Sequence, residues 1–322
     1  MRPQHIKDLT VGKDIHDPLL NSITGLVNLL LEGLCPPEVH KILFGGNLLA
    51  LAKKDGGVRP IAVGSVWRRL AAKCANAYAI KRLESHLSPL QLGVGVKGGA
   101  EAAIHSARRF LQSMSPGNFM IKLDFSNAFN SLRRDSMLEA VLREIPEIYN
   151  FCSLSYAENS ILFFHDFEIS SEEGPQQGDP LGPLLFALAL HPFLESLSSS
   201  IVLGYLDDIT LGGDANKLCA DLDIIESLSD QLGLSLNVKK CEIIHNENDP
   251  IPPRFANFRI LSKDACELLG APLCSGAALD VALATRCADL RRASDRLSLL
   301  SAHDALLISG ACRVEKNIRK IL

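Results

Sequence analysis

Two adjacent carboxylates, Asp207 and Asp208, lie between two short apolar runs in the segment IVLGYLDDITLGG, residues 201–213. Such a segment is typical of two short strands joined by a tight turn. Like charges side by side repel each other, so a compensating cation is expected there, and Mg²⁺ prefers carboxylate oxygens. The plain alternative is an exposed Asp-Asp turn. The pair therefore predicts a metal site only if a third carboxylate joins it.

A third carboxylate follows another apolar run upstream. The segment FMIKLDFSNAFNSL, residues 119–132, begins as a strand and carries Asp124 at its end. A lone Asp after a strand is most often a turn residue or the N-cap of a helix. If this strand pairs with the strands of residues 201–213, the three carboxylates lie side by side and can bind metal together.

A loop rich in Gly, Pro and Gln stands between these two segments. It reads EGPQQGDPLGPLLFALAL, residues 173–190, and runs into a long apolar stretch. Alone, the loop is typical of a linker before a buried helix. In chain order, the three segments resemble the palm of a reverse transcriptase. Asp124 to Phe129 match the A motif of that family, Gln176 to Pro180 the B motif, and Tyr205 to Asp208 the C motif.

Four further segments resemble parts of the same family in its order. LAKKDGGVRPIAV (51–63) is similar to the fingers hairpin, and QLGVGVKGGAEAA (91–103) to the segment between fingers and palm in non-LTR retrotransposon polymerases. LGLSLNVKKCEII (232–244) resembles the D motif, and ELLGAPL (267–273) resembles the E motif, or primer grip. The resemblance covers about residues 45–275.

This resemblance implies an α+β, right-hand polymerase fold. We expect fingers and palm with an antiparallel palm sheet, followed by a partial helical thumb. The implied divisions are an N-terminal helical extension at 1–44, fingers at 45–118, a palm with interleaved fingers elements at 119–275, and a partial thumb at 276–322.

The resemblance also implies catalytic roles for four residues. Asp124 and Asp207 would be the principal ligands of two Mg²⁺ ions, with Mn²⁺ as an alternative, and Asp208 would be a further carboxylate. Lys240, in the D motif beside Asn237, would donate a proton to the leaving pyrophosphate. A solvated surface lysine is an equally good account of Lys240.

Besides Phe129, five residues are implied at the nucleotide site. Lys53 and Arg59 would meet the triphosphate, because Arg binds phosphate through two nitrogens and Lys acts as a point charge. The carbonyl of Phe125 would complete a metal shell, and Gln177 and Gly178 would lie against the nucleotide. A charged hairpin tip is the alternative for this region, above all for Lys54.

The family places an aromatic ring under the sugar at the position of Phe129. A bulky ring there leaves no room for a ribose 2′-hydroxyl, the group that distinguishes RNA from DNA precursors. The alternative is an ordinary core phenylalanine. Phe129 therefore predicts selection of deoxynucleotides.

Composition and charge agree with a folded, intracellular protein. Of 322 residues, 47% are hydrophobic, and no stretch is long and apolar enough to span a bilayer, so no membrane partner is expected. Nine scattered cysteines without framework spacing favour a reducing compartment, the nucleus or cytoplasm, and no secretory signal opens the chain. Residues 51–122 hold twelve Lys or Arg against three acids, although the formal net charge is −4. This basic region suits a nucleic-acid template.

Periodicity predicts the elements that carry these residues. We expect a strand–turn–strand at 47–63 and strand structure at 160–170. Residues 280–322 are expected to be helical throughout. The other predicted helices are 19–34, 65–87, 99–114, 134–144, 147–158 and 215–233, the last capped by Gly233.

Together these features predict an RNA-directed DNA polymerase domain of a retroelement. Its partners would be an RNA template, a DNA or RNA primer and deoxynucleoside triphosphates. One alternative is an RNA-directed RNA polymerase, which usually carries Gly before the paired Asp where this chain has Leu206. The other is a domesticated or truncated retroelement protein that binds nucleic acid without polymerising.

Overall fold

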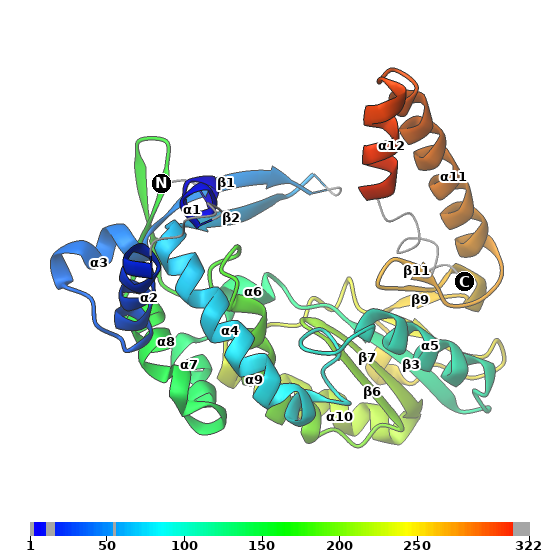
Figure 1. Cartoon of the computed structure of the whole chain (residues 1–322). Coiled ribbons are helices and arrows are strands. Elements are labelled where there is room, and N and C mark those ends of the chain that lie inside the picture. The colour runs from blue at the N-terminus through cyan, green and yellow to red at the C-terminus, as the bar shows by residue number, and fades with distance from the viewer. Residues whose placement is uncertain (1–2, 11–16, 54–55, 312–322) are drawn as a thin grey trace.

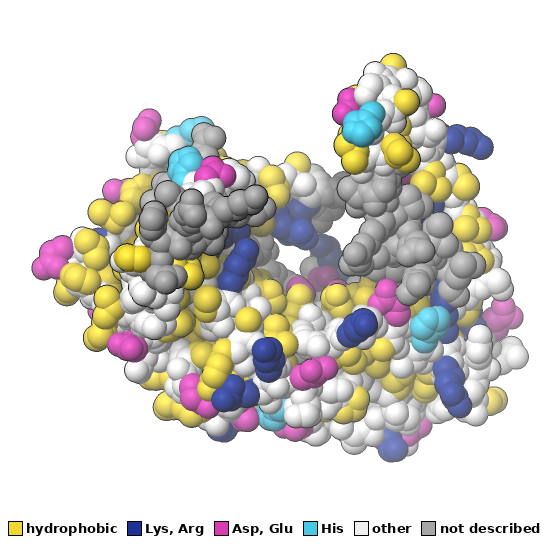
Figure 2. Space-filling view, viewed as in Figure 1, with side chains coloured by type: hydrophobic (Ala, Val, Ile, Leu, Met, Phe, Trp, Pro, Cys, Tyr) yellow, Lys and Arg dark blue, Asp and Glu magenta, His cyan; other side chains and the backbone are white. Residues whose placement is uncertain are grey.

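Helices and strands mix along the chain, which is the α+β class expected from the sequence. The computed structural model describes residues 3–10, 17–53 and 56–311. Figure 1 shows the hairpin of residues 46–64 at the upper left and two helices, Ala277–Leu297 and Ala302–Ala311, standing at the upper right. A sheet lies below them. The space-filling view is hollowed between these two sides, and Lys and Arg side chains are visible in the hollow (Figure 2).

The central sheet has five strands in the order β6-β7-β3-β8-β9. All neighbours pair antiparallel except β8 and β9, which run parallel. The predicted antiparallel palm sheet is thus confirmed for the strands that carry the carboxylates. The strands are β3 (Asn118–Leu123), β6 (Ile201–Tyr205), β7 (Asp208–Asp214), β8 (Glu242–Ile244) and β9 (Arg259–Leu261).

Alternation along β3 builds a core on each face of this sheet. Phe119, Ile121 and Leu123 join the larger apolar cluster, whereas Met120 joins a smaller one. Helices cover the larger-cluster face, and α9 is its most buried member, because its side chains are apolar almost all round. The helices contributing to this cluster include α4 (Val66–Leu87), α7 (Arg134–Glu144), α8 (Tyr149–Tyr156), α9 (Gly182–Glu195) and α10 (Ala215–Leu232).

The smaller cluster lies under a helix and a short hairpin that are far apart in the sequence. Helix α5 (Gly99–Gln112) packs there with the hairpin of β10 (Glu267–Leu268) and β11 (Ala271–Pro272), which is the predicted E motif. Lys122 shares the face of Met120 but stands nearer to the end of β3. That end of the face carries charged side chains in place of an apolar cover.

A second sheet, in the order β2-β1-β4-β5, carries the predicted fingers hairpin. The strand structure expected at 160–170 is itself a hairpin, and its first strand pairs parallel with β1. The tip residues Lys54 and Asp55 of the other hairpin lie outside the described residues. The strands are β1 (Gly46–Ala52), β2 (Val58–Gly64), β4 (Ser160–Phe164) and β5 (Phe167–Ser171).

The C-terminal region departs from the expectation of continuous helix over 280–322. Helix α11 (Ala277–Leu297) ends before Ser298, and α12 (Ala302–Ala311) begins after Ser301. Ser301 starts the second helix, because its hydroxyl accepts the backbone N–H of Asp304 at 3.2 Å and caps the new N-terminus. Residues 312–322 lie outside the described part of the chain.

The N-terminal region is helical in its described parts. Helix α2 packs against α4 and contributes Val27 and Leu30 to the larger cluster. None of the described helices is long and apolar enough to cross a membrane. The remaining elements are α1 (Pro3–Thr10), α2 (Asp17–Leu31), α3 (Pro37–Phe44), α6 (Ala128–Ser131) and the short 3₁₀ turns Pro146–Ile148, Pro253–Phe255 and Lys263–Ala265.

Candidate active site

The turn between β6 and β7 presents the carboxylate pair. Tyr205 pairs with Asp208 across the hairpin, so Leu206 and Asp207 form a two-residue turn. Leu206 has φ 59°, a left-handed conformation that side-chain-bearing residues rarely adopt. The predicted strand–turn–strand is confirmed, with an unusual backbone at its tip.

Asp124 follows β3 directly and lies beside this turn. Leu123, the last residue of β3, stands opposite Ile209 of β7. Asp124, which comes next, therefore approaches Asp208 at the start of β7. The Asp124 carbonyl accepts the backbone N–H of Asn237 at 2.8 Å, which fixes the strand end against the D-motif segment. The structure thus brings together the carboxylates of the A and C motifs.

The electrostatics of the three carboxylates favour a cation between them. Burial, followed by the charge of Asp207, raises the pKa of Asp124, while Lys240 and a hydrogen bond from Asn237 lower it. Crowding by protein atoms and the charges of Asp207 and Asp124 raise the pKa of Asp208 to about 6, although its side chain keeps contact with solvent. A bound divalent cation would relieve this repulsion.

A cleft of about 850 Å³ contains Asp124 and Asp207 together with most of the other predicted site residues. It lies between the fingers hairpin and the palm. The predicted residues that line it are Lys53, Arg59, Asp124, Phe125, Phe129, Gln177, Asp207 and Lys240.

Asp208 lines a neighbouring hollow of about 390 Å³, which it shares with Asp124 and Lys240. Asp207 lies in the turn and lines the larger cleft, whereas Asp208 begins β7 and lines the smaller hollow. Among the described residues, no three His, Cys, Asp or Glu side chains are grouped closely enough to hold a metal by themselves. This donor set still suits Mg²⁺, which is usually held by one or two carboxylates and completed by substrate phosphates.

The fingers hairpin turns one cationic face toward the cleft. Arg59 pairs with Leu51 across the hairpin, and Lys53 lies two residues beyond Leu51, so all three share a face. All three line the cleft, and both cationic side chains are exposed. The hairpin therefore places an ammonium and a guanidinium opposite the carboxylates, an arrangement that suits an anionic ligand.

The aromatic residues after Asp124 have separate environments. The Phe125 side chain is 7% exposed and belongs to the larger core, so its backbone is the part available to a ligand. Phe129 lies on the short helix α6, where its ring stacks on Phe186 with centroids 5.4 Å apart. Its half-buried side chain also lines the cleft, so Phe129 has one side against the core and another toward the cleft.

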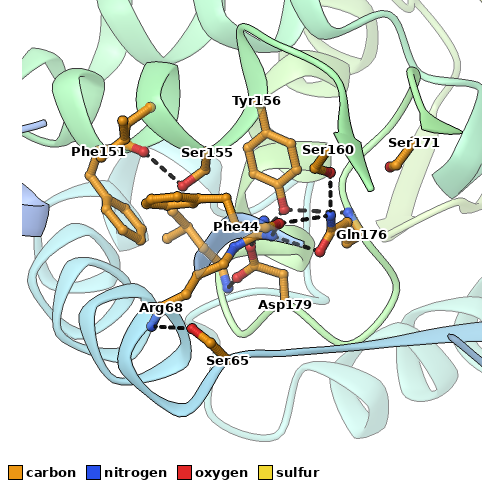
Figure 3. A network of polar contacts seen from close by, with 12 residues as sticks. Phe44, Ser65, Arg68, Phe151, Ser155, Tyr156, Ser160, Ser171, Gln176 and Asp179 are labelled. Carbon is orange, nitrogen blue, oxygen red and sulfur yellow. Dashed lines mark hydrogen bonds and ion pairs between the residues drawn. The ribbon is translucent and has the colours of Figure 1, made fainter. Parts of the chain in front are cut away.

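A buried polar network holds the B-motif loop, as Figure 3 shows. The guanidinium of Arg68, on α4, donates to the Asp179 carboxylate at 2.9 Å and to the Gln176 side-chain oxygen at 2.7 Å. Tyr156 donates to the same Asp179 oxygen at 2.6 Å, and Gln176 donates to Ser160 at 2.7 Å. Gln176 and Asp179 therefore fix the shape of the loop.

This network positions Gln177 and Gly178 against β2. The carbonyl of Gln177 accepts the N–H of Ala62 at 2.7 Å, and its side chain donates to Asn130 at 3.3 Å. Gly178 has φ 120°, and a Cβ there would lie 2.4 Å from the Ala62 carbonyl oxygen. Gly178 is not among the residues that line the cleft. The glycine is required by its contact with the fingers, and its nucleotide contact stays a prediction.

Sequence reasoning missed the residues that support the site from behind. Arg68, Tyr156 and Asn130 carry no motif signal in the printed sequence, because an arginine in an amphipathic helix is normally solvated. Their partners lie far away in sequence, with Arg68 and Asp179 separated by 111 residues. No local pattern encodes such a pairing.

A family model for reverse transcriptase (RNA-dependent DNA polymerase) matches residues 51–273. The match covers more than half of the chain, so the chain belongs to the reverse transcriptase family. It begins at the fingers hairpin and ends at the E motif, which are the limits that the motif resemblance suggested.

Two curated relatives come from retrotransposable elements. The chain is 30% identical over 248 residues to the SLACS 132 kDa protein of Trypanosoma brucei gambiense, covering 72% of this chain and 20% of that protein. It is 29% identical over 229 residues to a retrovirus-related Pol polyprotein from the type-2 retrotransposable element R2DM of Drosophila melanogaster. That match covers 62% of this chain and 20% of the polyprotein. The chain thus spans about a fifth of the length of these relatives, and the likeness to non-LTR retrotransposon enzymes is confirmed.

Solved structures of telomerase share the fold. Apo telomerase from Candida tropicalis has a TM-score of 0.51 at 15% identity, covering 72% of this chain and 49% of that chain. Telomerase from Candida albicans, in a complex with a fragment of telomeric RNA, has a TM-score of 0.52 at 11% identity, covering 72% of this chain and 46% of that chain. The right-hand polymerase fold is therefore confirmed.

Proposed function

We propose that this chain is an RNA-directed DNA polymerase domain that adds deoxynucleotides to a primer 3′-hydroxyl on an RNA template. The observation that carries the proposal is the cleft in which Asp124 and Asp207 face the cationic side of the fingers hairpin. Carboxylates on one wall and Lys53 with Arg59 on the other provide the charges needed for phosphoryl transfer from a triphosphate.

Each residue in the cleft has a role that its position supports. Arg59 and Lys53 bind and orient the triphosphate, and Phe129 limits the space at the sugar. Asp124 and Asp207 hold divalent cations, Mg²⁺ or Mn²⁺, with Asp208 as a further carboxylate. The chemistry that such cations supply is activation of the primer hydroxyl and stabilisation of the leaving pyrophosphate. Lys240 lies at the junction of both hollows and donates a proton to that leaving group.

Primer extension tests this proposal. Purified protein with an RNA template, a primer, deoxynucleotides and Mg²⁺ should extend the primer, whereas Asp207→Asn should abolish extension. Asp166→Asn is the matched control, because Asp166 is an exposed carboxylate between β4 and β5 and does not line the cleft. Failure of the wild-type chain under conditions in which a known polymerase extends the same primer would refute the activity.

A further inference from the structure

Gln91 is a wholly buried polar residue at the edge of the palm sheet. It is 0% exposed and begins the segment 91–103, which sequence comparison places between fingers and palm. Its chain runs beside β6: Leu92 donates to the Gly204 carbonyl, and Gly204 donates to the Leu90 carbonyl, both at 2.7 Å. The segment thus extends the sheet beside the strand that leads to the carboxylate pair.

The Gln91 side chain reaches past this edge to the turn itself. Its Oε1 accepts the backbone N–H of Leu206 at 2.8 Å and that of Gly93 at 3.1 Å. Its Nε2 donates to the Leu206 carbonyl at 3.4 Å. One amide side chain therefore takes both polar backbone groups of the residue directly before Asp207.

Leu206 needs such support because of its backbone conformation. At φ 59° its Cβ is crowded by its own backbone, a cost that glycine does not have. Non-glycine residues keep this conformation only where the surrounding structure over-determines it. Among the described residues, the Gln91 side chain supplies hydrogen bonds to both the N–H and the carbonyl of Leu206 and so supports this conformation.

Two glycines allow the clamp to approach so closely. A Cβ at Gly93 would lie 2.8 Å from the Leu206 nitrogen. A Cβ at Gly204 would lie 3.1 Å from the Leu90 carbonyl and 3.3 Å from the Gln91 Nε2. A side chain at Gly93 would crowd the Leu206 nitrogen and the Gln91 Oε1, and a side chain at Gly204 would first meet Leu194, at 2.7 Å.

We propose that Gln91 is a positioning residue that fixes the backbone of the Leu206-Asp207 turn and thereby aims the Asp207 carboxylate into the cleft. The proposal rests on the polymerase function proposed above for its kinetic consequence, but its structural content does not. Gln91 touches the turn backbone and not the substrate space, since it does not line the cleft.

The first test measures amide hydrogen exchange in the peptide that contains Leu206. Gln91→Met keeps the volume and removes both hydrogen bonds to Leu206 as well as the one from Gly93, so this peptide should exchange about tenfold faster or more, with little change elsewhere. The control is Leu218→Ala, which removes a buried apolar group from α10, remote from the turn. Unchanged exchange around Leu206 in Gln91→Met would overturn the proposal whether or not the protein polymerises.

The second test separates positioning from ordinary stability by kinetics. Measured well below its unfolding temperature, Gln91→Met should lose about ten- to a hundredfold in kcat, with the KM for deoxynucleotide changed by no more than about threefold. Leu218→Ala should keep its kcat under the same condition. Equal kcat losses in the two variants would show a merely structural role and contradict the proposal.

A third variant serves if Gln91→Met does not fold. Gly93→Ala leaves Gln91 in place but crowds the Leu206 nitrogen, so it should shift exchange and kcat in the same direction. Normal exchange and kcat in Gly93→Ala would contradict the clamp. A wild-type chain without activity would refute the proposed function, and the exchange experiment would still decide the clamp.

Discussion

Arg68 and Asp179 form an ion pair at 2.9 Å, with side chains only 2% and 3% exposed. The pair joins helix α4 to the loop that carries Gln177 into the cleft. Neither charge has water to replace its partner, so each depends on the other. Helix α4 and the B-motif loop are thus locked together through buried charge.

Arg68→Met should lower the free energy of unfolding by about 3–5 kcal/mol, because it leaves Asp179 charged and buried. Chemical denaturation measures this loss. Arg254→Met is the control, since Arg254 pairs with Asp223 and Glu226 near the surface, and it should cost no more than about 1 kcal/mol. Similar losses in both variants would show that the buried pair has no special weight.

Arg59→Ala should raise the KM for deoxynucleotides about tenfold or more, because charge-assisted bonds to phosphate are lost. Arg59→Lys should fall between wild type and Arg59→Ala, since lysine restores the charge but not the two-nitrogen contact. Steady-state kinetics of single-nucleotide addition gives these values. Arg143→Ala, on the exposed side of α7, should leave KM unchanged. An unchanged KM in Arg59→Ala would show that the hairpin does not contact the nucleotide through this residue.

Phe129→Val should admit ribonucleotides, because the smaller side chain opens space at the sugar. The ratio of kcat/KM for deoxy- over ribonucleotides should fall about tenfold or more. Phe167→Ala is the control, as Phe167 is 70% exposed on β5. Unchanged selectivity in Phe129→Val would assign this ring to the core alone, where it already stacks on Phe186.

Gly178→Ala should destabilise the fold by about 1 kcal/mol or more and slow nucleotide addition, because the new Cβ meets the Ala62 carbonyl. Gly270→Ala separates the two causes of that loss, which are the backbone strain at positive φ and the clash with the Ala62 carbonyl. Gly270 also has positive φ, at 75°, but nothing lies within 4 Å of its Cβ position. Equal effects of the two substitutions on stability and rate would leave the loop–hairpin contact without a role.

The three carboxylates of the candidate site were predictable because their signals are local. A charged pair inside an apolar hairpin and an Asp at a strand end require no knowledge of distant residues, and strand pairing then brings them together. Phe129 and Lys240 were predicted from their positions within the motifs, and both line the cleft. The split at Ser301 was missed, although the hydroxyl three residues before Asp304 is a capping signal.

The supporting residues were not predictable, because side-chain pairing over long separations leaves no periodic trace. Gln91 contacts Leu206 across 115 residues, and Arg68 contacts Asp179 across 111. The left-handed backbone of Leu206 was equally unpredictable from the sequence, since leucine rarely adopts positive φ. Such features appear only when the chain is folded around the motifs.

Single-nucleotide addition on an RNA template tests the central claim most directly. The wild-type chain should add one deoxynucleotide to an annealed primer in Mg²⁺, and a chelator should stop the reaction until Mg²⁺ is restored. Asp124→Asn should lose at least about a thousandfold in rate, since it removes a ligand on which charge stabilisation depends. Addition by Asp124→Asn at the wild-type rate, or no addition by the wild-type chain beside an active reference polymerase, would contradict the account.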